Sequence, residues 1–596
     1  MELNIIENKD ITSLTTFGIP VCARYFAEYA SERELLAISR RPEFLDNKVL
    51  HIGGGSNLLF EHDFNGLILH SRICGIKEYR KDHDTVFAIA GAGEKWTDLV
   101  EWCLARNYAG LENLANIPGE VGASAIQNVG AYGVEAKDVI HAVECFDTLS
   151  RKVVRFINEE CCFGYRDSIF KHDKFRGRYY VLRISFRLRP DGKPRNLEYG
   201  PLKHLEDKLG HTLSIQDVAR EVTTLRNSKL PDPEYIGSAG SFFKNPVVSM
   251  HMYHKFRERY PDMPAYPAGD DHMKLSAAWL IDRAGLKGHK IGGAQVYEKQ
   301  PLVIVNTGNA VAEDVRKLAD EVVMTVRSKF YITLKPEVNF IDTSITVTVL
   351  GSGTSKGVPE IGCNCRVCTS SDPHDKRLRA SVLVETAGLR ILIDPSPDFR
   401  EQALRINLAD IDAVLVTHSH YDHVGGFDDL RPFCAGEDLP VYLREDVNAD
   451  LHRRLDYCFR EHLYPGVPTF KMNVIDNEPF YINGLKIEPV EVLHGQIPIF
   501  GYRIGKFAYV TDAKTISEAE KDKLRNLDVL ILNSLRDIPH FAHLSYSEAM
   551  ALIEELKPKK AYLTHFNHEA GLHVELEERT PSNVFPAFDG MRVVIN

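Results

Sequence analysis

The sequence predicts two folded parts that meet near residue 343, the first of them of the α+β class. Before that point, short apolar strands alternate with glycine-rich turns and helical segments, an α+β pattern rather than a doubly wound one. From Thr343 to Leu350 a run of β-branched residues predicts the first strand of a new domain, and histidines and aspartates cluster beyond it. We therefore expect a domain boundary at about 342–345.

Composition and charge set the class of protein. Hydrophobic residues make up 44% and charged residues 26% of the 596 residues, which is enough apolar material for sizeable cores. The formal net charge is -11 and basic residues do not cluster, so no nucleic-acid partner is expected. The first residues do not resemble a signal peptide, and no stretch has the roughly 20 apolar residues of a spanning helix. We expect a cytoplasmic protein with no membrane partner, whose cysteines are thiols or metal ligands.

The elements of the first part can be placed along the chain. Glycine-rich turns follow the strand candidates, and a glycine ends one of the helices as a C-cap would. We expect a strand ending at His51-Ile52, a strand at Thr85–Ala90, a helix at Lys95–Arg106, a Gly/Ser-rich region at Ile117–Gly133, and helices at Leu275–Ala284 (before Gly285) and Val311–Phe330.

Two glycine-rich loops are candidates for holding a phosphate group. Successive backbone N–H groups in such a loop form an anion nest, and glycine lets them approach closely. The first loop is Gly53, Gly54, Gly55, Ser56 and Asn57, which is not the dinucleotide fingerprint and alone is more typical of a plain turn. The second loop supplies Gly119, Gly122, Ser124, Gln127, Asn128, Gly130 and Gly133. Together the two loops can hold a pyrophosphate and then a ring system.

Three further segments offer polar side chains. Arg166 lies in YRDS, Ser241 in GSFFKNP and Glu337 in KPEV. Each segment alone is also typical of a surface charge, a turn serine or a solvated glutamate. Their combination is what makes them candidates for one site.

Taken together, these segments resemble the UDP-N-acetylenolpyruvoylglucosamine reductase family in its longer form, from about Thr12 to Asp342. The resemblance spans roughly 330 residues, so it does not depend on one loop. The matching strings are TFG at 16–18, GGGSNLL at 53–59, the 117–133 loop, FGYRDSIFK at 163–171, LPDP at 230–233, GSFFKNP at 240–246 and KPEVNF at 335–340.

The resemblance implies a flavoenzyme. It implies a flavin-binding region of two α+β subdomains over 1–210, a substrate-binding domain over 211–342, noncovalent FAD between the glycine loops, and NADPH as reductant. The implied activity is that of a UDP-N-acetylmuramate dehydrogenase, which reduces UDP-N-acetylglucosamine enolpyruvate in peptidoglycan synthesis. Arg166 and Glu337 would stabilise the enolate-like intermediate and Ser241 would protonate it. The substrate would be bound by Tyr199, Arg226, Lys229 and Asn245.

A second class of flavoprotein shares this fold. Alcohol oxidases of the vanillyl-alcohol-oxidase group often attach the flavin covalently through histidine or cysteine. Serine, asparagine and leucine follow the first glycines here, which argues against that class. Flavin released on denaturation would indicate noncovalent binding.

The second part carries a dense group of metal-ligand side chains. The apolar run Ile411–Thr417 leads into His418, His420, Asp422 and His423, ligands that suit zinc, manganese or iron. Buried polar groups at this density would be left largely unpaired without a metal. Single candidates follow other strand-like runs, at His494, Asp512 and His565. A lone histidine after a strand is more often an ordinary loop residue, but the shared context favours ligands.

Residues 345–596 resemble the metallo-β-lactamase fold, an αββα sandwich, and more closely the cyclic phosphodiesterases of phosphonate breakdown (the PhnP family). This rests on the histidine cluster, GSGTSKGVP at 351–359, a cysteine cluster, and HFNH at 565–568. The resemblance assigns His418, His420 and His494 to one divalent metal, Asp422, His423 and His565 to a second, and Asp512 to both, with zinc or manganese as the ion. It implies a structural zinc on Cys363, Cys365, Cys368 and His568, and an acid at His543.

Other interpretations of this part stay open at this point. The cysteines can be three free thiols, although their spacing is poor for that, and His543 can be a surface histidine. The implied substrate is a phosphodiester or cyclic phosphate small molecule. Nucleases, thioesterases and lactamases share the histidine motif, and the domain can also be a structural module.

Overall fold

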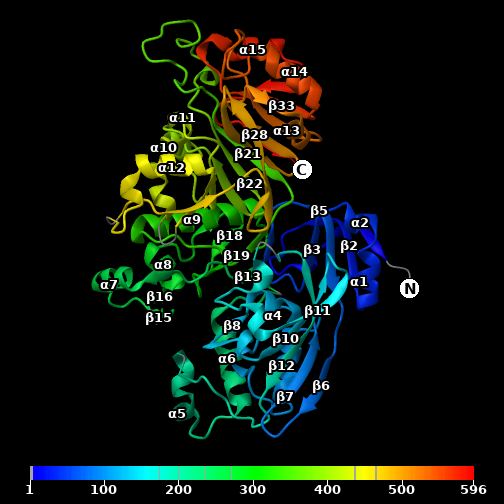
Figure 1. The fold of residues 1–596 in the computed structure, drawn as a ribbon. Helices are drawn as coiled ribbons and strands as arrows, with labels where there is room; N and C mark the ends of the chain where they lie inside the picture. The colour runs from blue at the N-terminus through cyan, green and yellow to red at the C-terminus, as the bar shows by residue number, and fades with distance from the viewer. Residues whose placement is uncertain are drawn as a thin grey trace. The chain divides into compact units, whose positions relative to one another are not determined.

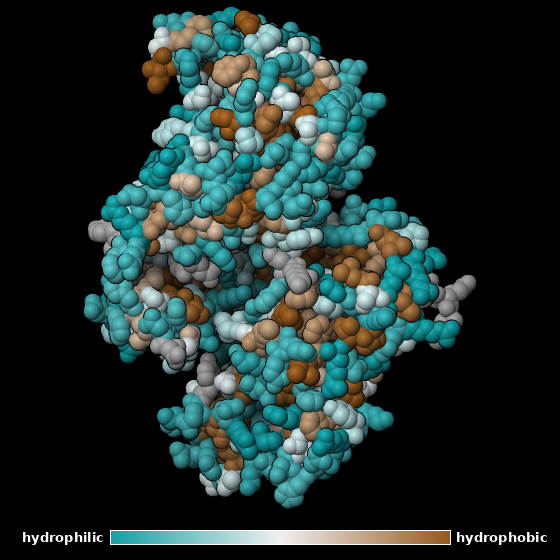
Figure 2. Space-filling view, viewed as in Figure 1, coloured by the Kyte–Doolittle hydropathy of each residue, from teal (hydrophilic) through white to brown (hydrophobic). Residues whose placement is uncertain are grey.

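The structure is a computed structural model that describes residues 4–172, 175–198, 200–233, 235–269, 271–434, 438–463 and 466–595. The chain forms two compact units, one of residues 1–322 and 334–343, the other of residues 323–333 and 344–596. Figure 1 shows the elements of both units in chain order. Among the described residues, no helix is long and apolar enough to cross a membrane. In the space-filling view, hydrophilic residues cover most of the visible face and apolar residues form small groups (Figure 2).

The first sheet of the first unit carries the first glycine loop. Helices α1 (Glu32–Ile38) and α2 (Pro42–Leu45) connect two of its strands. Ser31 caps α1 by accepting a hydrogen bond from the Glu34 N–H. The sheet has the order β1 (Ile5–Asp10), β2 (Cys22–Tyr29), β5 (Phe64–Ser71) and β3 (Val49–Ile52). Both β2 and β3 run parallel to β5. The loop at 53–57 therefore leaves the sheet at the carboxyl end of its parallel edge strand β3.

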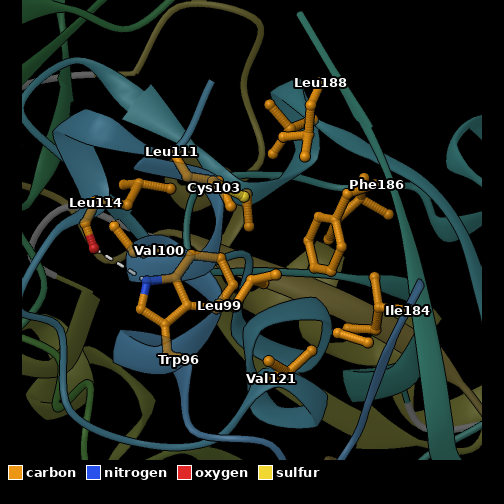
Figure 3. Close-up of a cluster of buried hydrophobic side chains, with 14 of the residues drawn as sticks. Trp96, Leu99, Val100, Cys103, Leu111, Leu114, Val121, Ile184, Phe186 and Leu188 are labelled. Atoms are coloured by element: carbon orange, nitrogen blue, oxygen red, sulfur yellow. Dashed lines mark hydrogen bonds between the residues drawn. The ribbon is translucent and has the colours of Figure 1, made fainter. Parts of the chain in front are cut away.

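A second, antiparallel sheet supports the second glycine-rich region. Its order is β11 (Lys152–Ile157), β10 (Ile140–Asp147), β12 (Tyr179–Leu188), β7 (Val86–Gly91) and β6 (Ile76–Lys81). Helices α3 (Trp96–Leu104) and α4 (Val121–Gln127) share one hydrophobic core with it. Figure 3 shows Trp96 in this core, where its Nε1–H donates to the Leu114 carbonyl at 3.0 Å. That bond satisfies the one polar group of a buried tryptophan.

The rest of the first unit is built from small sheets and helices. The helices are α5 (Leu205–Leu209), α6 (Ile215–Lys229), α7 (Met250–Arg259), α8 (Ala277–Ala284) and the start of α9 (Ala312–Phe330), which continues into the second unit from residue 323. One sheet has the order β13 (Gly237–Ser241), β19 (Val303–Asn306), β18 (Ala294–Val296), β17 (Lys290–Ile291), and another the order β14 (Val247–Ser249), β16 (His272–Leu275), β15 (Ala265–Pro267). Two strand pairs complete it: β20 (Asn339–Ile341) with β4 (Leu58–Phe60), and β8 (Gly130–Ala131) with β9 (Val134–Glu135).

The second unit is a sandwich of two large sheets. The first is β26 (Phe470–Val474), β25 (Leu439–Leu443), β24 (Ala413–Leu415), β23 (Leu389–Ile393), β22 (Ser381–Thr386), β21 (Ile345–Gly351) and β35 (Arg592–Ile595). The second is β27 (Phe480–Ile482), β28 (Leu485–His494), β29 (Ile497–Ile504), β30 (Phe507–Val510), β32 (Val529–Asn533), β33 (Lys560–Thr564) and β34 (Val584–Pro586), with β31 (Thr515–Ile516) paired to β28.

Three hydrophobic cores define the layers of this sandwich. The central core joins the two sheets, for example Val347 and Ile391 with Tyr502 and Ile531. An outer core packs the first sheet against α10 (Phe399–Arg405) and α12 (Glu445–Arg454). The other outer core packs the second sheet against α14 (Tyr546–Leu556) and α15 (His573–Arg579). The order is helix, sheet, sheet, helix, so the predicted αββα class is confirmed, as is the α+β class of the first part.

Most of the predicted elements are present with small shifts in their ends. The helices expected at Leu275–Ala284 and Val311–Phe330 are α8 and α9, and Gly285 ends α8 in the left-handed region, at φ +87°. The strand expected at Ile411–Thr417 is shorter, with only Ala413–Leu415 paired as β24. Ile117–Gly133 is not a continuous loop, because it contains helix α4. Gly122 disfavours a helix by propensity, but a Cβ there would lie 2.8 Å from the Ala92 Cβ, so packing selects glycine.

Candidate functional site

The two glycine loops of the first unit meet at their backbones. A Cβ atom at Gly54 would lie 3.2 Å from the Gly119 Cα, and one at Gly119 would lie 2.9 Å from the Ser56 Oγ. Gly55 has φ +59°, and a Cβ there would lie 1.9 Å from the Leu14 carbonyl oxygen. Ser56 Oγ donates to the Pro118 carbonyl at 3.4 Å. Gly55 and Gly119 leave no room for a larger residue and Gly54 leaves little, and the cradle they form suits a cofactor that needs close backbone N–H groups.

Several polar residues of the second loop are engaged inside the protein. The buried Ser124 donates from Oγ to the Val121 carbonyl at 2.7 Å. Asn128 is fully buried and donates to the Gly164 carbonyl at 2.7 Å and to the Glu135 carboxylate at 2.8 Å. Gln127 is the last residue of α4, and Gly130 and Gly133 belong to the β8–β9 turn. The side chains of Ser124 and Asn128 thus shape the loop, and any contact from these two residues to a cofactor falls to their backbone atoms.

Arg166 and Glu337, far apart in sequence, form an ion pair beside the Ser241 strand. The Arg166 Nε lies 2.7 Å from the Glu337 Oε1, and both side chains are mostly buried. The Glu337 N–H donates to the Phe242 carbonyl at 2.8 Å, which places Glu337 next to the residue that follows Ser241. Asn57 of the first glycine loop donates from Nδ2 to the Glu337 carbonyl at 3.0 Å. Glu337 is therefore linked to the first glycine loop through Asn57, to the strand of Ser241 through Phe242, and to Arg166 through the ion pair.

The charge around Glu337 is dominated by cations. Burial raises the pKa of Glu337, while Arg166, Lys244 and Lys171 oppose that rise. A raised pKa is the direction that a hydrogen-bond-donating Glu337 requires. Burial and the neighbouring Lys244 lower the pKa of Lys171 to about 8, despite the opposite effect of Glu337. The sequence analysis did not single out these lysines, although both lie in matching strings, FGYRDSIFK and GSFFKNP.

The predicted substrate ligands lie in different settings. Arg226 donates from Nε to the Asn116 carbonyl at 2.9 Å, and burial lowers its pKa. Lys229 is exposed at the last position of α6, three residues further on. Asn245 accepts the Ala277 N–H on Oδ1 at 2.9 Å, so that oxygen helps to start α8. Tyr199 lies outside the described residues. Substrate contacts of these residues stay predictions.

In the second unit, the predicted metal ligands converge at the ends of strands. His418 and His420 follow β24, while Asp422 and His423 lie in the short helix α11 (Tyr421–Val424). His494 ends β28, and Asp512 and His565 follow β30 and β33. Two groups have ligand atoms within 4.8 Å of one another: His418, His420, His494 and Asp512, and then Asp422, His423, Asp512 and His565. Asp512 belongs to both groups, the division that the family resemblance implies.

The hydrogen bonds of these histidines leave atoms free for metals. Nε2 of His418 and of His423 is buried without a hydrogen-bond partner among the described residues. His423 Nδ1 lies 2.7 Å from the Asp394 carboxylate, and His418 Nδ1 lies 3.0 Å from the Thr417 hydroxyl. Orphaned buried nitrogens, each on a ring held by its other nitrogen, are the usual arrangement of metal-bound histidine. The residues present therefore fit two divalent ions.

Asp394 is a site residue that the sequence analysis missed. It is fully buried and accepts hydrogen bonds from the Thr417 N–H at 2.8 Å and the Thr417 hydroxyl at 2.7 Å, besides its contact with His423. It directly follows β23, so it carries the same signal as Asp512, an aspartate at the end of a buried strand. A single aspartate after a strand is too common to stand out alone.

His543 is mostly buried and is not the surface histidine of the alternative interpretation. Its Nδ1 lies 3.9 Å from the Asp512 carboxylate. Its ring centre lies 4.7 Å from that of His494 and 5.0 Å from that of His565. Burial lowers the pKa of His543 to about 3, against the effect of Asp512. With so low a pKa, the His543 ring is uncharged near neutral pH. Its role as an acid stays a prediction.

The cysteine cluster forms a separate group with His568. The His568 Nδ1 lies 3.2 Å from the Cys363 Sγ, 3.6 Å from the Cys365 Sγ and 3.4 Å from the Cys368 Sγ. A tetrahedral zinc with ordinary Zn–S and Zn–N bonds needs nitrogen–sulfur separations of about 3.5 Å. The Cys368 N–H lies 3.4 Å from the Cys365 Sγ and lowers the pKa of that thiol to about 6. The donor set therefore fits a closed zinc site.

Comparison with known proteins bears on the first unit directly. Residues 23–155 match the FAD binding domain model, and residues 232–341 match the model described as UDP-N-acetylenolpyruvoylglucosamine reductase, C-terminal domain. The reductase of that name from Neisseria gonorrhoeae is 47% identical over 340 residues, which cover 57% of this chain and 98% of the relative. The chain belongs to the UDP-N-acetylenolpyruvoylglucosamine reductase family. The family member from Bacteroides fragilis is 45% identical over 332 residues, 56% of this chain and 98% of the relative.

This member of the reductase family carries a second domain. Residues 389–566 match the β-lactamase superfamily domain model. A solved diphosphatase structure from the PhnP family is 42% identical and covers 42% of this chain and 98% of its own, with a TM-score of 0.40. A solved reductase structure from Thermus caldophilus is 24% identical to this chain. The match covers 57% of this chain and 99% of the solved chain, with a TM-score of 0.39. The reductase and its flavin-binding domain are thus followed by a metallo-β-lactamase-fold domain, as predicted.

Proposed function

We propose that the first unit reduces UDP-N-acetylglucosamine enolpyruvate to UDP-N-acetylmuramate, with NADPH as reductant, as a step of peptidoglycan synthesis in the cytoplasm. The observation that carries this proposal is the Arg166–Glu337 pair, which lies beside the Ser241 strand and is tied to the first glycine loop by Asn57. A substrate that gains negative charge at a carboxylate-bearing carbon needs cations and a proton donor in one place. Family membership supports the same substrate.

Each residue of the proposed site would have a separate role toward the substrate or the cofactor. Bound FAD would supply the hydride for the terminal carbon of the enolpyruvyl group. Arg166 would bind the substrate carboxylate through its guanidinium fork, and a protonated Glu337 would donate a hydrogen bond to it. Lys244 and Lys171 would add positive charge around the same group. Ser241 would give its hydroxyl proton to the carbon beside the carboxylate. The glycine loops would hold the cofactor by backbone N–H groups.

The proposal is tested by following the flavin absorbance of the full chain without oxygen. NADPH should bleach the flavin, and the enolpyruvyl UDP-sugar should restore it with formation of UDP-N-acetylmuramate. Flavin that is bleached by NADPH but not restored by this substrate would reject the proposed reaction. Restoration by a simple alcohol-derived aldehyde would instead favour the alcohol-oxidase class.

For the second unit, we propose a metal-dependent hydrolase of phosphodiesters or cyclic phosphates, with two divalent ions, zinc or manganese, and a separate structural zinc. The convergence of seven ligand side chains from both sheets of the sandwich carries this proposal. When bound, the two ions would activate water and neutralise the phosphoryl oxygens. Asp394 would fix the ring of His423, and His543 would protonate the leaving oxygen once an anionic substrate is present.

The hydrolase proposal is tested with the full chain stripped of metal and reloaded with zinc or manganese. A chromogenic phosphodiester, a cyclic nucleotide, a nucleoside diphosphate, a thioester and a β-lactam would be compared as substrates. Metal-dependent cleavage of a phosphate ester is the expected result. Cleavage of the thioester or lactam alone would reject it, and inactivity toward all five with both metal sites filled would favour a structural module.

A further inference from the structure

A histidine between two glutamates lies under the first glycine loop, in a place where the family resemblance assigns no residue. His70 belongs to β5 and is buried, with its Nδ1 3.0 Å from the Glu28 carboxylate and its Nε2 2.8 Å from the Glu120 carboxylate. A carboxylate can only accept hydrogen bonds, so both ring nitrogens donate and the ring carries a positive charge. Burial alone would lower the pKa of His70, but the hydrogen bonds to Glu120 and Glu28 raise it.

Glu120 uses only one of its two carboxylate oxygens in this arrangement. Its Oε1 accepts from His70, while its Oε2 is buried and has no hydrogen-bond partner among the described residues. A buried carboxylate oxygen without a hydrogen bond is costly, because it has lost its water and gained no donor in exchange. Such an atom calls for a donor, and the part of the chain that the structure describes does not provide one.

The free oxygen lies at the glycine cradle. A Cβ atom at Gly53 would lie 3.3 Å from the Glu120 Oε2, and one at Gly54 would lie 3.8 Å from the Glu120 Cγ. Glu120 also directly follows Gly119, the residue of the second loop that touches Gly54. The carboxylate therefore lies where the two glycine loops meet, the place where the pyrophosphate of FAD is expected.

We propose that Glu120 binds the cofactor, with its Oε2 accepting a hydrogen bond from a hydroxyl group of the ribitol or ribose of FAD. These hydroxyls flank the pyrophosphate and are donors, whereas the phosphate oxygens are acceptors and cannot satisfy a carboxylate. The charge on His70 offsets the repulsion between Glu120 and the pyrophosphate. Glu28 is more exposed than Glu120 and contacts the opposite ring nitrogen of His70. We therefore expect Glu28 to contact the histidine but not the cofactor. The proposal rests on FAD binding and not on the identity of the substrate.

The affinity of the flavin-free full chain for FAD tests this proposal, measured by flavin fluorescence. Glu120→Ala should bind FAD about 10- to 100-fold more weakly, the loss expected for a hydrogen bond to a charged group. Glu120→Gln keeps an acceptor oxygen and should lose less. Glu28→Gln is the matched control, because it changes the other partner of His70, and its affinity should stay within about twofold. Tighter or unchanged FAD binding by Glu120→Ala would overturn the proposal, since the carboxylate would then only repel the pyrophosphate.

FAD analogues that each lack one ribitol or ribose hydroxyl provide a test that does not depend on any variant folding. The unaltered protein should bind one analogue about 10-fold more weakly or worse, while Glu120→Ala should bind that analogue and FAD equally. Equal binding of all analogues by the unaltered protein would overturn the proposal and assign the oxygen to a water molecule. Failure of the unaltered protein to bind FAD at all would instead reject the flavin site itself.

Discussion

The flavin cradle and the metal cluster are built in opposite ways. At the cradle, side chains are missing: Gly54 and Gly119 touch through their backbones, and a methyl group at either position has little room. At the metal cluster, seven side chains converge, and among the described residues the Nε2 atoms of His418 and His423 are buried without a hydrogen-bond partner. The first site is sensitive to added volume and the second to removed ligand atoms. Substitution by alanine therefore adds a methyl group at the glycine cradle but removes a ligand at the metal cluster.

The largest effect is expected for Asp422→Ala. Loss of one ligand from the Asp422, His423, Asp512 and His565 group removes several kcal/mol of metal-based catalysis, so phosphodiester hydrolysis should fall about 1000-fold or more. Steady-state rates and metal content by mass spectrometry measure this change. Reductase activity is the internal control, because none of its proposed residues lies beyond residue 342. Hydrolysis at the unaltered rate would reject the ligand assignment, and loss of reductase activity would reject the independence of the two sites.

Ser241→Ala is expected to give the next largest effect. Removal of a general acid should slow reoxidation of the reduced flavin by the enolpyruvyl substrate about 100-fold or more. Bleaching by NADPH needs no such proton and should stay nearly unchanged. Stopped-flow absorbance separates the two half-reactions. Equal loss in both would show damage to the flavin site and would contradict the role assigned to Ser241.

Asp394→Asn should weaken hydrolysis or metal affinity about 10- to 100-fold, the usual cost of losing a carboxylate that orients a metal-bound histidine. The amide cannot accept from His423 and Thr417 as the carboxylate does. Asp428→Asn is a suitable control, since Asp428 is half exposed and pairs with Arg431. Metal titration of both variants provides the measurement. An Asp394→Asn protein with the affinity of the control would show that His423 is held by packing alone.

Gly54→Ala tests the flavin cradle by adding volume, whereas the substitutions at the metal cluster remove ligand atoms. The new methyl group would lie 3.2 Å from the Gly119 Cα, a contact that requires the loops to move apart by a few tenths of an ångström. We expect FAD binding about 10-fold weaker, because the backbone N–H groups lose their alignment. Gly75→Ala is the control, since a Cβ there meets no atom within 4 Å, although its positive φ adds strain. Full FAD affinity in Gly54→Ala would mean that contact between the loops is not needed.

Cys365→Ser should have the smallest effect on either activity. It removes one thiolate from the closed group with Cys363, Cys368 and His568, so one zinc per chain should be lost and the melting temperature should fall. A loss of about 2 kcal/mol corresponds to roughly 4–8 °C for a domain of this size. Zinc analysis and thermal melts of the full chain test this. Retention of all zinc with an unchanged melting temperature would favour three free thiols.

Four of the predicted metal ligands could be named as candidates from the sequence because their signal is local. His418, His420, Asp422 and His423 lie within six residues after one strand, and the spacing fixes their common location. The glycine loops give a local signal too, but the second, which was predicted as a continuous loop, contains helix α4. Helix α4 depends on the contact of Gly122 with Ala92, a tertiary effect that overrides the low helix propensity of glycine.

Contacts between residues that are far apart in the sequence could not be predicted from local patterns. His70 and Glu120 are 50 residues apart, and nothing in either local pattern predicts that they meet. Asp394 lies 29 residues from His423 in an ordinary strand-to-loop position. The family resemblance places Arg166 and Glu337 in one site, but their ion pair with each other comes only from the structure. Partners that are set by how sheets pack, rather than by spacing, need the structure.

If Cys363, Cys365, Cys368 and His568 hold the proposed zinc, their separation along the chain bears on the order in which a growing chain acquires its cofactors. His568 follows Cys363 by 205 residues, so the fourth ligand leaves the ribosome long after the three thiolates. At a synthesis rate of about 5–20 residues per second, roughly 10–40 s pass between the synthesis of the three cysteines and that of His568. Both glycine loops are complete by residue 133, well before that interval begins. During synthesis the chain can therefore take up flavin first, while its cysteines remain exposed to oxidation until the last strands are made.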